Sequence, residues 1–144
     1  MNAAAFPVLV IHGIADARRA LAAVRTAGGN GVTLLSAPAA ACFMGPAWWR
    51  ALVSLAAAEH PTIGITDLLD CGDAAGRALE ALRLGQRQLV LAWSCRQRTT
   101  VLERAGPLGA IVHGDRPAAL DLADRDAERR LRTWLASGQA GPTP

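Results

Sequence analysis

The sequence predicts an α/β protein: a single-domain, three-layer sandwich of about five mostly parallel strands flanked by helices. Short apolar segments alternate along the chain with segments of helical periodicity. The apolar segments are apolar on both faces, as expected of parallel strands that helices cover on both sides. A chain of 144 residues is also long enough to bury one core without a disulfide or a metal.

The predicted strands are short runs rich in valine, isoleucine and leucine. Glycine, proline or polar residues bound each run, and such residues commonly end strands. The third run is interrupted by Asp67. The five strands are expected at residues 6–13, 31–38, 62–70, 87–94 and 109–114.

The predicted helices follow these strands one by one, at residues 15–28, 45–61, 73–85, 97–106 and 124–138. Asp16 and Asp73 stand where a side chain could cap the first and third helices. The last helix and the residues just before it carry three acid–arginine pairs with a spacing of four, an arrangement that stabilises helices. These pairs are Asp121–Arg125, Asp126–Arg130 and Glu128–Arg132.

Strand order cannot be deduced from this pattern. The alternation is similar to that of flavodoxin-like or Rossmann-like domains at the level of fold alone, and folds of this kind carry many functions. A half-barrel of βα units is the alternative. We expect one domain over residues 1–137 and a disordered tail over 138–144, while residues 36–45 have no clear element and could form a lid or an interface.

Composition excludes several classes of function. All fifteen cationic side chains are arginine, so a lysine Schiff base and a Walker-type phosphate loop are excluded. The net charge of +3, without interleaved aromatic and basic residues, does not favour nucleic acid as a partner.

No apolar run reaches the roughly 20 residues of a membrane span. The N-terminal sequence does not resemble a signal peptide, and three widely spaced cysteines predict reduced thiols and a cytoplasmic protein.

Polar residues follow every predicted strand. In open parallel sheets, ligands bind outside the carboxyl ends of the strands, so these residues are expected to share one edge. Capping and turn formation would explain the same aspartates and serines without any ligand. The candidates at this edge are His12, Ser36, Asp70, Cys71, Asp73, Ser94, His113, Asp115 and Arg116.

Cys71 is the candidate nucleophile, because a thiol just before a helix N-terminus has a lowered pKa. His12 or His113 would act as its base. Asp70 and Asp73 oppose this prediction, since neighbouring carboxylates disfavour a thiolate. The side chains of His12, His113, Asp73 and Cys71 also suit zinc, but their spacing matches no metal motif, so we predict no metal and assign no cofactor.

The last candidates are Arg116 and the tryptophan pair. Arg116 beside His113 could hold a carboxylate or phosphate, although pairing with Asp115 would explain it equally well. Trp48 and Trp49 point about 100° apart on a helix, so one can enter the core while the other lies at its margin. The marginal ring is a candidate for a homodimer interface, where aromatic residues are enriched.

Three functions are consistent with these observations. The first is binding of a small molecule at the carboxyl ends of the strands. The second is a homodimeric interaction module without catalysis, with Trp48 or Trp49 at the contact. The third is a thiol-dependent enzyme that uses Cys71 with a histidine base.

Overall fold

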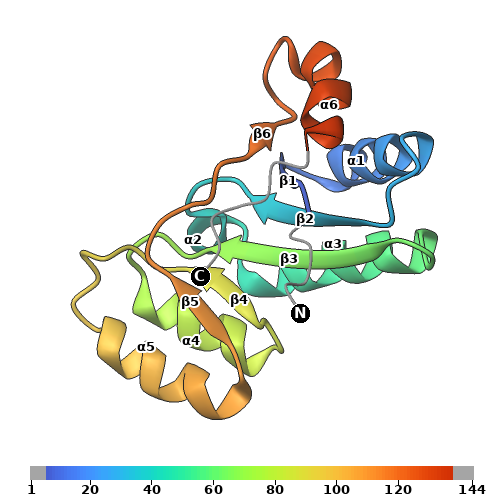
Figure 1. Cartoon of the computed structure of the whole chain (residues 1–144). Helices are drawn as coiled ribbons and strands as arrows, with labels where there is room; N and C mark the ends of the chain where they lie inside the picture. The colour runs from blue at the N-terminus through green and yellow to red at the C-terminus, as the bar shows by residue number, and fades with distance from the viewer. Residues whose placement is uncertain (1–5, 138–144) are drawn as a thin grey trace. The chain divides into compact units, whose positions relative to one another are not determined.

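The computed structural model describes residues 6–137. Six strands in this range form one parallel sheet, in the order β5-β4-β3-β2-β1-β6 (Figure 1). The elements are β1 (Val8–Ile11), α1 (Ile14–Thr26), β2 (Gly31–Ser36), α2 (Ala40–Phe43), α3 (Pro46–Glu59), β3 (Gly64–Asp70), α4 (Ala75–Arg83), β4 (Gln88–Val90), α5 (Arg98–Ala105), the 3-10 helix η1 (Gly106–Leu108), β5 (Ile111–His113), β6 (Leu120–Asp121) and α6 (Ala127–Ala136).

This arrangement confirms the predicted α/β class with a parallel sheet flanked by helices. The neighbours of β1 are β2 and β6. In flavodoxin-like and Rossmann-like sheets the first strand instead has the third or fourth strand as a neighbour, so the strand order here differs from both. The sixth strand, β6, was not predicted, because two residues are too short to show a strand pattern. The short helix α2 was also missed.

The contacts between residues divide the chain into two compact units, which are described separately. Unit 1 comprises residues 1–35, 54–67 and 117–144, and unit 2 comprises residues 36–53 and 68–116. The single domain expected over residues 1–137 stays a prediction. The tail expected at residues 138–144 lies outside the described residues. No helix in the described part of the chain is long and apolar enough to cross a membrane.

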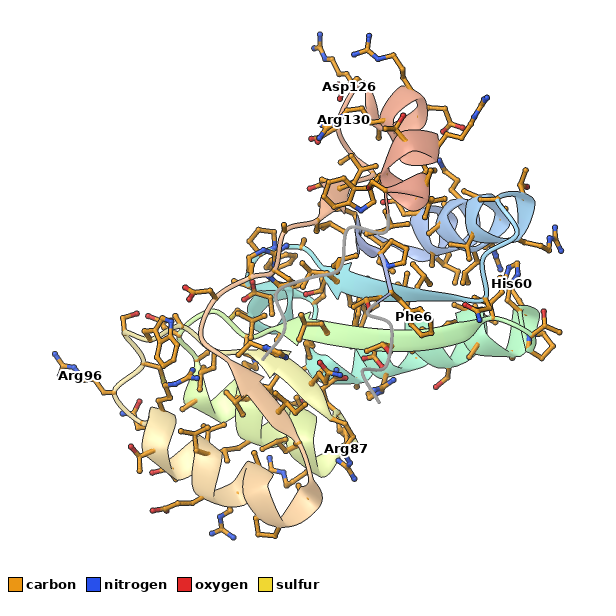
Figure 2. The ribbon with its side chains drawn as sticks, viewed as in Figure 1. Phe6, His60, Arg87, Arg96, Asp126 and Arg130 are labelled. Carbon is orange, nitrogen blue, oxygen red and sulfur yellow. The ribbon has the colours of Figure 1, made fainter. Side chains whose placement is uncertain are left out.

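Unit 1 has its core between β1 and α1. All four residues of β1 are buried, and α1 buries one stripe of side chains at helical spacing. Asp16 does not occupy the N-cap, which is Gly13; its carboxylate accepts a hydrogen bond from the backbone N–H of His12 at 2.9 Å. The ring of Phe6, labelled in Figure 2, lies so close to Gly31 that an added Cβ would be 2.2 Å from it and the ring would have to move.

Unit 2 contains the ends of β2 and β3, all of β4 and β5, and the helices α2, α4 and α5. Its strands pair in parallel, with Leu69 opposite Leu89 and Val90 opposite His113. Leu69 and Leu89 are fully buried. Helices α4 and α5 pack against each other. The pairing brings the carboxyl ends of β3, β4 and β5 to one edge of this unit.

Candidate functional site

Three of the predicted residues form one polar cluster in unit 2. Arg116 Nη1 donates to Asp70 Oδ2 at 2.6 Å, and Arg116 Nη2 donates to the backbone oxygen of Ser36 at 3.0 Å. The Ser36 hydroxyl accepts from the backbone N–H of Asp70 at 2.9 Å, and Asp70 Oδ1 accepts from that of Gly72 at 2.8 Å. Asp70 is only 4% exposed. The predicted ligand groups therefore come together, but they bind one another.

The explanation that pairs Arg116 with Asp115 is wrong. The ion-pair partner of Arg116 is Asp70, 46 residues earlier in the chain. Asp115 instead accepts a hydrogen bond from the indole of Trp93. The sequence neighbours Asp115 and Arg116 thus take part in two different contacts, both of them at the carboxyl edge of unit 2.

Cys71 is fully buried, and its environment opposes a thiolate. Burial, together with the nearby charges of Asp70 and Cys42, raises the pKa of the thiol to about 12. The effect expected from a helix N-terminus has the opposite sign. Helix α4 begins only at Ala75, so Cys71 is not at its first turn. The thiol lies 3.9 Å from the backbone oxygen of Leu69.

The rest of this segment forms a turn. Gly72 has a φ of +58°, a left-handed conformation that favours glycine. Asp73 is exposed, and the predicted cap by Asp73 is wrong: the N-cap of α4 is Ala74, without a side-chain hydrogen bond. Asp73 thus has no capping role and stays a predicted ligand group.

The two predicted bases lie in different units. His113, at the end of β5 in unit 2, has its Nε2 3.2 Å from Gln88 Oε1. Burial and the charge of Arg98 lower the pKa of His113, which favours the neutral ring. His12, in unit 1, has its Nε2 2.7 Å from Asp121 Oδ1. The side-chain partners of both histidines in the described residues are therefore oxygen groups, not thiols.

Trp93 is a residue of the carboxyl edge that the sequence interpretation missed. Its side chain is 67% exposed, yet three contacts fix its position. The indole Nε1 donates to Asp115 Oδ2 at 2.9 Å, and the guanidinium carbon of Arg98 lies 4.3 Å from the ring centroid. A Cβ on Gly114 would be 1.9 Å from the ring, so the ring packs directly on that glycine.

Arg98 connects this indole to the sheet. Its Nη1 donates to the backbone oxygen of Leu91, and its Nη2 donates to that of Val112 at 3.1 Å. Leu91 directly follows β4 and Val112 lies in β5, so one guanidinium connects the two segments while contacting Trp93. The neighbouring Arg96 points away from the ribbon (Figure 2).

The predicted extent of the fourth strand explains why Trp93 was missed. The sequence predicts a strand over residues 87–94, but β4 ends at Val90 and Trp93 lies in the following turn. The available signal was the Trp93–Ser94 pair, since a large aromatic residue beside a polar one ends the apolar run. Ser94 is exposed beside it, as expected for a residue of this edge.

The tryptophan pair of α3 has the expected arrangement. Trp49 is fully buried, whereas Trp48 is partly exposed. Their ring centroids are 6.1 Å apart, with the planes tilted by 46°. One ring is therefore in the core and the other at its margin. The interface role of Trp48 stays a prediction.

Comparison with known proteins adds no assignment. No model of a protein family matches the sequence, and no curated protein matches it. The function is therefore argued from the side chains themselves.

Proposed function

We propose that the protein binds a small molecule at the carboxyl ends of β4 and β5, with the indole of Trp93 as the main contact surface. The observation that carries this proposal is an indole that is two-thirds exposed and yet fixed by Asp115, Arg98 and Gly114. A ring held in place before binding loses little freedom when a ligand stacks on it. The carboxyl edge of a parallel sheet is also where such folds bind ligands.

The surroundings of Trp93 favour a ligand with a flat, weakly polar face and O–H or N–H donors at its edge, such as a sugar ring. The indole offers the apolar surface. The Asp115 carboxylate and the exposed Ser94 hydroxyl offer hydrogen-bond acceptors beside it. The Arg98 guanidinium is directed at two backbone oxygens, so it supports the platform and is not offered to an anion.

A screen of monosaccharides and other small polyhydroxylated rings by ligand-observed NMR tests this proposal. Trp93→Ala should weaken any binding found by about tenfold, equal to roughly 1.4 kcal/mol. Leu102→Ala is the matched control, because Leu102 is also an exposed apolar side chain of unit 2 but lies on α5. Equal affinities for Trp93→Ala and the control would place the ligand elsewhere.

A homodimeric interaction module is the second candidate function. The partly exposed ring of Trp48 supports it, together with Phe43 and Met44, which are 65% and 45% exposed just before α3. Aromatic residues and methionine are enriched at protein interfaces. Light scattering at micromolar concentrations should then give a dimer mass that Trp48→Ala reduces to that of a monomer. A monomer mass for the unmodified protein contradicts this candidate.

A thiol-dependent enzyme is the third candidate, and the burial of Cys71 opposes it. A nucleophile must reach its substrate as a thiolate, whereas the pKa of this thiol is raised to about 12.

We place the protein in the cytoplasm because its three cysteines are few and widely spaced. Nucleic acid is not among the proposed partners.

A further inference from the structure

Helices α1 and α6 of unit 1 lie side by side (Figure 1). Residues of both helices line a groove of about 610 Å³. This volume is within the range of small-molecule sites, roughly 300–1,000 Å³. Small and aliphatic side chains of both helices form most of its lining: Ala22, Ala23, Ala27, Leu131 and Leu135. The groove therefore offers an apolar surface that belongs to a single unit of the structure.

Arg132 lies at this groove without an acidic partner among the described residues. The sequence predicts an ion pair between Glu128 and Arg132, one turn apart on α6. That pair does not form, because Glu128 Oε2 accepts a hydrogen bond from Arg19 Nη2 of α1 at 3.1 Å. Arg19 thus bridges the two helices, and the Arg132 guanidinium is left beside the apolar lining.

The other cations of α6 are engaged elsewhere. Arg130 Nη1 lies 3.6 Å from carboxylate oxygens of both Asp124 and Asp126, and Arg129 Nη2 lies 3.3 Å from Asp126. Asp126 and Arg130 are labelled in Figure 2. The acidic side chains of this segment therefore compensate Arg129 and Arg130. Among the arginines of α6, Arg132 is the one that lines the groove, and its charge has no acidic partner among the described residues.

We propose that this groove binds a single-chain anionic amphiphile, such as a medium-chain carboxylate. The apolar lining would cover the alkyl chain, and burial of each CH₂ group is favourable. The guanidinium of Arg132 would bind the carboxylate, with the planar, charge-assisted geometry that arginine provides. A cationic amphiphile would lack this contact and would meet the positive charge of Arg132.

Isothermal titration of the full chain with sodium decanoate, below its critical micelle concentration, tests this proposal. The expected result is binding of one decanoate per chain. Arg132→Gln should weaken it about tenfold. Arg129→Gln should leave the affinity within twofold, because it removes the same charge from the same helix away from the groove. Decyltrimethylammonium should not bind at the concentrations at which decanoate does.

A second variant tests the groove itself. Ala23→Leu adds a side chain to the lining without disturbing helix propensity, and it should abolish decanoate binding while the circular dichroism spectrum is retained. Equal affinities for Arg132→Gln and Arg129→Gln would overturn the proposal, as would binding that survives Ala23→Leu. So would a groove occupied by a second chain: a dimer that Ala23→Leu dissociates, with no decanoate bound.

Discussion

The carboxylate of Asp70 and the guanidinium of Arg116 form an ion pair of 2.6 Å at the carboxyl edge of unit 2. Arg116 follows β5, and Asp70 is the last residue of β3. The pair therefore holds the segment after β5 against the ends of β2 and β3, where Arg116 also binds the Ser36 carbonyl. The ion pair occupies the place where the sequence predicts a bound ligand.

Removing one partner of this pair should destabilise the fold strongly. Arg116→Ala leaves the Asp70 carboxylate buried without its cation, so urea unfolding should show a loss of about 3–5 kcal/mol. Arg104→Ala is the control, because Arg104 is an exposed arginine of α5. A loss below 1 kcal/mol for Arg116→Ala would mean that the pair is solvated and contributes little.

Cys71 should resist alkylation in the folded protein. With a pKa of about 12, only about one thiol in ten thousand is a thiolate at pH 8. Iodoacetamide should modify the exposed Cys42 and leave Cys71 unmodified until urea unfolds the chain. Mass spectrometry of the tryptic peptides locates the modified thiol. Faster reaction at Cys71 than at Cys42 below pH 7 would restore the thiol-dependent enzyme.

His113 should make stability depend on pH in the acidic range. Its lowered pKa means that the unfolded chain binds a proton more readily. The free energy of unfolding should therefore begin to fall as pH drops below the unfolded value near 6.5, and continue to fall until pH passes the lowered pKa of the folded protein. Urea midpoints at pH 7.5 and 5.5 should therefore differ less for His113→Gln than for the unmodified protein. The same pH dependence in both proteins would exclude His113 as its source.

Gly114→Ala should displace the indole of Trp93. The added methyl group would lie 1.9 Å from the ring, so the hydrogen bond to Asp115 should break. The indole N–H resonance of Trp93 should shift, at a cost of about 1 kcal/mol in unfolding free energy. Gly106→Ala is the control, since a Cβ there meets no atom within 4 Å. An unshifted resonance would show that the ring is not held by this packing.

Local patterns were sufficient for the main elements. The buried stripe of Ala17, Leu21 and Val24 on α1 follows from helical spacing in the sequence alone. The apolar run at Val8–Ile11 likewise shows that β1 is covered on both faces. Strand ends were less well predicted: β4 stops at Val90, four residues before the predicted end of that strand, and this hid Trp93. Apolar residues continue past the end of β4 into the following turn, so composition alone does not mark where the strand ends.

The sequence by itself determined the α/β class, the parallel sheet and the residues near its carboxyl edge, because burial periodicity and turn residues act over a few positions. Only the tertiary structure decided which of these residues contact one another. Asp70 meets Arg116, Asp115 meets Trp93 and not Arg116, and Glu128 meets Arg19 and not Arg132. Each choice depends on the strand order and helix packing, which bring together side chains that lie 22 to 109 residues apart in the chain.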